Sequence, residues 1–302
     1  MSISIVGAGL SGLLAGNMLR HHNPTIVEAQ KALPNNHSAV LRFKTAIIGD
    51  VLGIPFRKVT VLKAVIPWMN PVADALAYSY KNSGEYRSDR SIVSGNEVAE
   101  RYISPPDLIL RMAEQLTVLY NTKLNNKLTR LPIISTIAMP VLMKLLKYPN
   151  QPEFRYVQGF NVSAMIPNCD AYIGLIVPDP QHPFSRVSIT GSHMIAEVPR
   201  PQKTGTNYYA SIAIMAAALV GIKPGELKDI QVSNQQYAKI LPIDDKVRRD
   251  FIYWATNEHN IYSLGRFATW RPGLLMDSLV NDIRLIDGWI RSNDKYARFR
   301  HK

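Results

Sequence analysis

The spacing of apolar residues changes twice near the start of the chain. Residues 2–6 (SISIV) have the β-rich character of a strand, whereas residues 10–22 (LSGLLAGNMLRHH) carry apolar side chains at helical spacing. Residues 24–29 (PTIVEA) are again strand-like. The pattern therefore predicts a strand, a turn, a helix and a second strand, which is the start of an α/β domain.

The remainder of the chain alternates between helical and strand-like stretches, with no repeat and no low-complexity linker. Residues 78–95 (YSYKNSGEYRSDRSIVSG) are polar and aromatic, which fits either an inserted substrate-side element or an exposed hairpin. Residues 132–148 read as a strand leading into a short helix. The other predicted helices are residues 105–116, 207–222, 244–260 and 274–293, and the other predicted strands are residues 58–66, 117–131 around an Asn-Asn turn, 153–164, 171–180, 184–198 and 261–267.

Three glycines join the first strand to the first helix. Gly7, Gly9 and Gly12 have G-x-G-x-x-G spacing, and Glu28 ends the next strand, which is the setting of a dinucleotide-binding Rossmann turn. The first glycine allows the tight turn, the second lets the backbone approach a pyrophosphate at the helix N-terminus, and the third lets helix and strand pack. Glu28 is expected to accept hydrogen bonds from a ribose hydroxyl. The predicted dinucleotide contacts in this region are Gly7, Ala8, Gly9, Leu10, Ser11, Gly12, Glu28 and Ala29.

Composition limits the class of protein. The chain has 302 residues, of which 46% are hydrophobic, so it can form one large domain or two interleaved ones. No uncharged apolar run approaches 18 residues, and the N-terminus shows no secretion signal. The single cysteine, Cys169, cannot form an internal disulfide and is interpreted as a packing residue. We therefore expect a cytoplasmic protein with no membrane association and no metal site.

The charge indicates an anionic partner. Thirty-five Lys and Arg residues against 23 Asp and Glu residues give a net charge of +12, and the pI is about 9.7. Basic and aromatic residues are interleaved in residues 79–90 and 295–302, where they could contact a phosphate backbone and stack on exposed bases. DNA or another polynucleotide is therefore one predicted partner, and small anions are the alternative. Further basic residues lie between Arg111 and Lys147, namely Lys123, Lys127, Arg130, Lys144 and Lys147.

The C-terminal region resembles a known family. Residues 261–283 (IYSLGRFATWRPGLLMDSLVNDI) are similar to the closing segment of flavoproteins of the UDP-galactopyranose mutase and amine-oxidase superfamily, of the glutathione-reductase-2 type. In that segment a strand ends in Gly-Arg, a loop with an aromatic residue and an Arg follows, and a helix begins beneath the flavin. The resemblance implies FAD as the cofactor. It places Gly265, Arg266, Trp270, Arg271, Met276 and Asp277 at the family's positions, and all of these except Arg271 are predicted cofactor contacts.

Two further stretches resemble the same family. Residues 107–146 are similar to its middle segment, which makes residues 120–124, including Leu124, the expected adenine edge. Residues 176–192 (IVPDPQHPFSRVSITGS) are similar to its substrate-side strand pair, with Arg186 after Pro183 and Phe184. The chain lacks the family's glycine pair after the ribose acid, having NNHSAVLRFK (35–44) there, and Arg42 is expected to take the pyrophosphate role of the family's arginine.

Together these features predict an α/β fold in which a Rossmann-like FAD-binding domain is interleaved with an α+β substrate domain built on an antiparallel sheet. Residues 1–56, 105–148 and 258–302 are assigned to the first domain, and residues 57–104 and 149–257 to the second.

The predicted function is that of an FAD-dependent oxidoreductase of the amine-oxidase type. It would remove hydride from an amine-bearing carbon, with a modified nucleotide or hypermodified DNA base as substrate. The alternatives are a UDP-galactopyranose mutase-like nucleotide-sugar enzyme that uses reduced FAD, and a non-catalytic flavin-bound module. The candidate catalytic residues are His37, Lys44 and Arg186, and Tyr208 and Tyr209 are further candidates for the flavin face.

Overall fold

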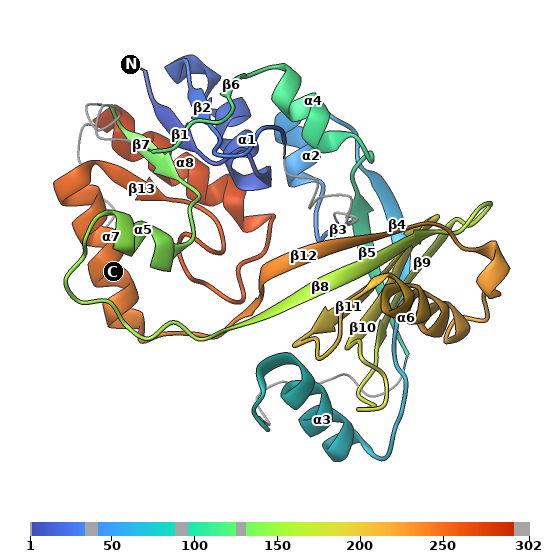
Figure 1. Ribbon diagram of the computed structural model, residues 1–302. Coiled ribbons are helices and arrows are strands. Elements are labelled where there is room, and N and C mark those ends of the chain that lie inside the picture. The colour runs from blue at the N-terminus through green and yellow to red at the C-terminus, as the bar shows by residue number, and fades with distance from the viewer. Residues whose placement is uncertain (1, 34–41, 88–95, 125–130, 293–302) are drawn as a thin grey trace.

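The computed structural model describes residues 2–33, 42–87, 96–124 and 131–292. Two sheets form the framework, and Figure 1 shows them side by side, with the long strands β8 and β12 extending from the first sheet across the second. The fold is therefore mixed α/β, with one parallel sheet and one mixed sheet. No helix in the described ranges is both long enough and apolar enough to cross a membrane.

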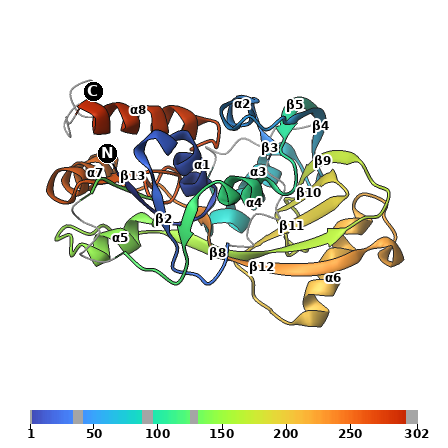
Figure 2. The same cartoon turned by 90° about the horizontal axis from the view of Figure 1, so that it is seen from above.

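The first sheet has the strand order β13-β7-β1-β2-β6, and all of its strands run parallel. Alternate residues of all these strands except β6 enter different cores. Ile5 and Ile26 pack with helices α1, α4 and α8, whereas Val6 and Val27 pack with α5 and α7. Figure 2 shows α8 and α5 on opposite sides of these strands. The strands are β1 (Ser4–Val6), β2 (Thr25–Val27), β6 (Thr117–Leu119), β7 (Ile133–Ser135) and β13 (Ile261–Ser263).

The helices and the short 3-10 helix η1 of this part cover both faces of the parallel sheet. Four of its strands, β1, β2, β7 and β13, are largely buried on both sides, which explains their mainly apolar sequences, whereas the edge strand β6 is exposed. The bounds are α1 (Leu10–Met18), η1 (Arg20–His22), α2 (Ile47–Leu52), α4 (Leu108–Glu114), α5 (Met139–Leu145), α7 (Asp245–His259) and α8 (Ser278–Ser292).

The second sheet has the order β12-β8-β11-β10-β9-β4-β5-β3. Helix α6 covers it with small residues, among them Ala213, Ala216 and Ala217, which are fully buried against the sheet. The elements are β3 (Arg42–Phe43), β4 (Arg57–Val65), α3 (Pro71–Ser83), β5 (Glu97–Ile103), β8 (Tyr156–Met165), β9 (Ala171–Ile176), β10 (Arg186–Gly191), β11 (His193–Pro199), α6 (Thr206–Ala218), the short 3-10 helix η4 (Pro224–Glu226) and β12 (Lys228–Ile240).

This sheet differs from the antiparallel one that the sequence predicts, because β4 and β9 pair in parallel. The cause is the path of the chain. Strands β3, β4 and β5 form one antiparallel group, and β8 to β12 form another. Between the two groups the chain returns to the parallel sheet to form β6 and β7, and the groups then join edge to edge at β4 and β9.

The predicted domain boundaries stay a prediction, but the packing of two elements bears on them. Strand β3, which the sequence assigns to the dinucleotide part, pairs with β5 in the second sheet. Helix α7, assigned mostly to the substrate part, packs on β13 of the parallel sheet. Within residues 78–95, residues 78–83 form the end of helix α3, and residues 88–95 lie outside the described ranges.

Candidate functional site

The glycine turn between β1 and α1 is closely packed. A Cβ atom at Gly12 would lie 1.9 Å from the carbonyl oxygen of Gly7, so only glycine fits there. Helix α1 begins after Gly9 and has neither a side-chain cap nor an acidic residue in its first turn. No side chain among the described residues therefore accepts a hydrogen bond from the first N–H groups of α1. Free N–H groups at a helix N-terminus are able to bind an anion.

Glu28 follows β2 and lies beside this turn. Its side chain is buried, and its carboxylate accepts the N–H of Ala8 at 2.7 Å and the N–H of Gln30 at 2.9 Å. Because these bonds fix the carboxylate at the carboxyl end of the parallel strands, it stands where a nucleoside bound to the turn would present its ribose. Contact with a ribose stays a prediction.

The C-terminal segment lies against the same turn. A Cβ atom at Gly265, whose φ is +95°, would lie 2.8 Å from Oγ of Ser11 in the first turn of α1. Met276 packs against the core that α1 and α8 share. The carboxylate of Asp277 accepts the N–H and hydroxyl of Thr45 at 2.7 and 2.6 Å and the N–H of Lys44 at 3.2 Å. Segments from both ends of the chain therefore meet around the N-terminus of α1.

Other predicted site residues lie farther inside the structure. The Trp270 side chain is 1% exposed and donates its indole N–H to the carbonyl oxygen of Leu241 at 2.8 Å. Leu124 packs at the edge of the same core. Tyr208 and Tyr209 belong to the first turn of α6 and pack against the core of the second sheet, where burial raises the pKa of Tyr208. His37 lies outside the described residues.

The side chain of Arg42 extends from β3 to residues of β9 and β10 in the second sheet. Its Nε donates to Oγ1 of Thr190 at 2.6 Å, and its Nη2 donates to the carbonyl oxygens of Ile173, at 2.8 Å, and Ile189. Burial, together with the nearby charge of Arg186, lowers the pKa of Arg42 to about 10. Its donors are thus directed at the sheet, and a role at a pyrophosphate stays a prediction.

Four charged side chains from separate elements line a cavity of about 220 Å³ where the two parts of the fold adjoin. They are Arg186 on β10, Glu197 on β11, Lys239 on β12 and Arg266 after β13. Glu197 lies 3.4 Å from Nη1 of Arg186 and 3.2 Å from Nζ of Lys239. Burial opposes ionisation of Glu197, but the charges of Arg186 and Lys239 hold its pKa at about 2. Three cations therefore surround one carboxylate, and we call this the cationic pocket.

The sequence pointed to Arg186 and Arg266 but missed Glu197 and Lys239. Glu197 is a charged residue within an apolar strand, which was the available signal. Lys239 lies on β12, a strand that the sequence analysis did not identify.

A larger cavity of about 640 Å³ opens between the start of α4 and the turn from β10 to β11. Its walls are mainly apolar and include Pro105, Ile109 and Tyr172. His193 also lines it, and burial lowers the pKa of this histidine, which favours its neutral form. Like the cationic pocket, this cavity combines residues from both parts of the fold.

Comparison with known proteins supports the fold and leaves the family open. No protein-family model matches the chain, and no curated protein matches its sequence. The solved structures that share its fold include a glycine oxidase from Bacillus cereus ATCC 14579, with a TM-score of 0.56, 12% identity and coverage of 95% of each chain. A complex of aklavinone-11 hydroxylase with FAD and aklavinone gives a TM-score of 0.54 at 11% identity and covers 97% of this chain and 62% of that one. The fold is thus similar to that of FAD-binding oxidoreductases.

Within that class, a reduced UDP-galactopyranose mutase shares the arrangement over nearly the whole length. The TM-score is 0.68 at 13% identity, and the match covers 99% of this chain and 96% of the mutase. An identity this low supports a common fold and leaves substrate and reaction to be argued from the residues themselves.

Proposed function

We propose that the protein binds FAD at the N-terminus of α1 and acts as an FAD-dependent oxidoreductase. The observation that carries this proposal is the meeting of Gly265 with Ser11 at the glycine turn. A dinucleotide site needs only the turn and the acid after β2. A segment from the other end of the chain at the same point gives the site a second wall, which is what a flavin extending beyond its pyrophosphate requires.

The residues of this chain would divide the work along the cofactor. The N–H groups of α1 would bind the pyrophosphate, and Glu28 would accept hydrogen bonds from the ribose. Asp277 holds the backbone at Thr45 and so joins the segment after β3 to the C-terminal segment. Bound FAD supplies the capacity to accept or donate hydride, and the protein supplies position and electrostatics.

The cationic pocket supports an anionic substrate. Its excess of positive charge would bind a phosphate or carboxylate group, and Arg186 would orient that group through charge-assisted hydrogen bonds. Oxidation of an amine-bearing carbon in a modified nucleotide or hypermodified DNA base is the specific form that we propose. The net charge of +12 supports it. Of the basic residues proposed to contact a polynucleotide, Arg90, Lys127, Arg130 and all those in residues 295–302 lie outside the described ranges.

A nucleotide-sugar enzyme that works with reduced FAD is the second candidate. It is favoured by the match to the mutase over 99% of this chain. The cationic pocket suits a diphosphate as well as a single phosphate, so the pocket does not separate the two candidates. The two candidates are separated by how activity depends on the redox state of the flavin, because a mutase-like enzyme is active only with pre-reduced flavin.

The cofactor is tested by purification and extraction. We expect a yellow protein that releases FAD on denaturation. Glu28→Ala should weaken FAD retention, whereas Glu114→Ala, which removes an exposed carboxylate from α4, should not. A colourless protein without extractable flavin, or equal FAD retention in the two variants, would overturn the proposal.

The substrate is tested by anaerobic reduction of the bound flavin, followed by its absorbance. The panel contains free amines, modified nucleosides and nucleotides, modified DNA and nucleotide sugars. Reduction by an amine-bearing nucleotide, with hydrogen peroxide formed when air is admitted, supports the oxidase. Turnover of a nucleotide sugar only after chemical reduction of the flavin supports the mutase-like enzyme instead.

A further inference from the structure

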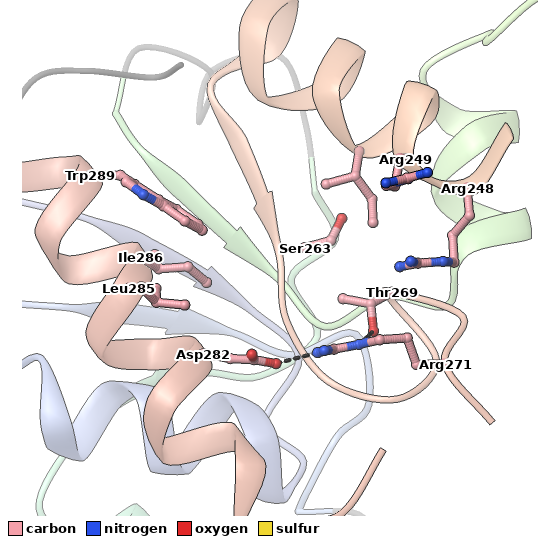
Figure 3. Close-up of a pocket in the computed structure, with 10 residues that line it drawn as sticks. Arg248, Arg249, Ser263, Thr269, Arg271, Asp282, Leu285, Ile286 and Trp289 are labelled. Carbon is pink, nitrogen blue, oxygen red and sulfur yellow. Dashed lines mark hydrogen bonds and ion pairs between the residues drawn. The ribbon is translucent and has the colours of Figure 1, made fainter. Parts of the chain in front are cut away.

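A second cationic pocket lies at the edge of the parallel sheet, between α7, α8 and the loop after β13. Figure 3 shows Arg248 from α7 and Arg271 from the loop on one side, and Leu285 and Trp289 from α8 on the other. The cavity has a volume of about 160 Å³. It shares no described lining residue with the cationic pocket at the junction of the two sheets, so we call it the edge pocket.

Both arginines are held in place and keep donors for a ligand. Arg248 donates from Nε and Nη2 to Oδ1 of Asp245, at 2.9 and 2.6 Å. Arg271 donates from Nε to Oγ1 of Thr269 at 3.0 Å and from Nη2 to Asp282. A guanidinium has five N–H groups, and within the described residues Nη1 of neither arginine donates a hydrogen bond. Each arginine therefore has donors beyond those that fix it.

The charge of the edge pocket is also unbalanced. Arg249 lines it as a third guanidinium and pairs with the same carboxylate as Arg248, at 3.3 Å. Three cations thus face two carboxylates, those of Asp245 and Asp282, which leaves one positive charge. The side chain of Arg248 is only 14% exposed, so its charge is poorly screened by water and attracts an anion more strongly than a surface arginine would.

Ser263, at the end of β13, adds a polar group to the pocket wall. The residue is 2% exposed, and its Oγ has no hydrogen-bond partner among the described residues. A buried hydroxyl without a partner is unfavourable and is rare in folded proteins. An acceptor within the edge pocket would satisfy it.

The volume of the edge pocket and its apolar wall restrict the kinds of ligand that fit it. A volume of 160 Å³ corresponds to about five water molecules in the liquid, which suits a tetrahedral oxyanion with part of a small attached group. Ile252, Leu285, Ile286 and Trp289 form the apolar side. Two guanidinium groups from different elements match an anion with several acceptor oxygens, and phosphate offers more of these than a carboxylate does.

We propose that the edge pocket binds a phosphate monoester, with its phosphate between Arg248 and Arg271 and its apolar group against Leu285 and Trp289. The site is separate from the proposed FAD and substrate sites, and its occupation does not depend on the function proposed above.

The test is calorimetric titration of the full-length protein, purified with whatever cofactor it retains, in a buffer free of phosphate and sulfate. Phenyl phosphate and inorganic phosphate are titrated separately. We expect phenyl phosphate to bind at least tenfold more tightly, because only the ester reaches the apolar wall. Equal affinities would overturn the assignment of the ester group, and the absence of binding by either ligand would overturn the site.

Variants locate the binding. Arg248→Gln and Arg271→Lys should each weaken binding of phenyl phosphate at least tenfold. Arg284→Gln, which removes an exposed charge from α8 outside the pocket, should change it less than twofold. If Arg248→Gln binds as the wild type does, the ligand lies elsewhere, for instance at the N-terminus of α1, and the proposal is wrong.

A fourth variant separates loss of the site from loss of folding. Asp282→Asn removes the carboxylate that competes for Arg271, so we expect binding to tighten severalfold. A misfolded protein cannot produce this gain. Thermal unfolding of each variant gives the folded fraction, and unchanged or weaker binding by folded Asp282→Asn would contradict the proposed role of Arg271.

Discussion

Replacing Gly265 by alanine tests whether the C-terminal segment forms a wall of the cofactor site. The added Cβ atom would lie 2.8 Å from Oγ and 3.2 Å from Cβ of Ser11, and the backbone φ of +95° disfavours any side chain. Two separate effects are therefore expected, one on the backbone of residue 265 and one on the contact with α1. A control is needed that has the first effect without the second.

Gly221 provides that control. Its φ is +73°, and a Cβ atom there would meet nothing within 4 Å. Both alanine variants should lose about 1–3 kcal/mol of stability from the strained backbone. Only Gly265→Ala should also carry a packing strain of about 1–3 kcal/mol. If the turn relieves that strain by moving away from α1, FAD affinity falls by about tenfold to a hundredfold, since each factor of ten corresponds to about 1.4 kcal/mol.

The assay is FAD binding to the flavin-free protein, followed by quenching of FAD fluorescence, with unfolding measured separately by calorimetry. The double variant Ser11→Gly with Gly265→Ala removes the atoms that clash, so it should regain FAD affinity while it keeps the loss of stability from the backbone. The reasoning fails if Gly265→Ala binds FAD like the wild type, or if Gly221→Ala loses as much affinity.

Three further predictions concern stability. The pKa of Glu197, about 2, lies below its ordinary value of 4.5 because of the two cations beside it. Its ionised form therefore stabilises the fold above about pH 4.5, and this contribution, at most about 3 kcal/mol, is lost as the pH falls toward 2. Urea unfolding of Glu197→Gln should show a flatter dependence on pH in this window, and a slope equal to that of the wild type would contradict the assignment. Burial opposes the charge of Asp287, but hydrogen bonds from neighbouring histidines, His22 at 2.7 Å among them, lower its pKa. Asp287→Asn should therefore lose stability mainly above pH 4 in thermal melts. An equal loss of stability at pH 3 would argue against this role of the carboxylate. Lys81 donates to three carbonyl oxygens at 2.7 to 2.8 Å. Lys81→Met should therefore lower the free energy of unfolding in urea by about 1–3 kcal/mol, whereas Lys246→Met, at an exposed position, should lower it by less than about 1 kcal/mol. Equal losses in the two variants would remove any special role for Lys81.

The local pattern of the sequence predicted the parallel part of the fold well. Strands β1 and β2 and helix α1 follow from apolar spacing and three glycines within residues 2–29, because everything that specifies them is near in sequence. The parallel pairing of β4 with β9 did not follow, since it joins residues 62–65 to residues 173–176 through a return of the chain to the other sheet. Helix α3 was also missed, and one reason is that its interior buries Asp74, Ser79 and Asn82, which weakens the apolar period.

For the candidate sites too, the sequence predicted features encoded by neighbouring residues and missed those that join distant parts of the chain. The glycine turn and Glu28 were found because their spacing along the chain carries the chemistry. The cationic pocket and the edge pocket each depend on side chains from at least three elements, whose approach no local pattern encodes. Glu197 illustrates this, because its two cationic partners lie 11 and 42 residues away in the sequence.

The location of the positive charge bears on the substrate. A net charge of +12 suits a polynucleotide or a small anion equally, because it does not say where the excess lies. Several exposed cations on the second sheet and α4 are already paired, such as Arg57 with Asp170, Lys58 with Glu100 and Arg111 with Asp107. The two pockets, in contrast, each hold more cations than carboxylates. Pockets of this size suit small anions, whereas a polynucleotide needs a continuous exposed surface, so among the described residues the charge favours a nucleotide-sized substrate. Retardation of DNA as a function of salt decides the matter, because a protein that contacts about six phosphates shows a slope of about −5 in log K against log salt. A slope that steep would favour a polynucleotide over the small anion that the two pockets suggest.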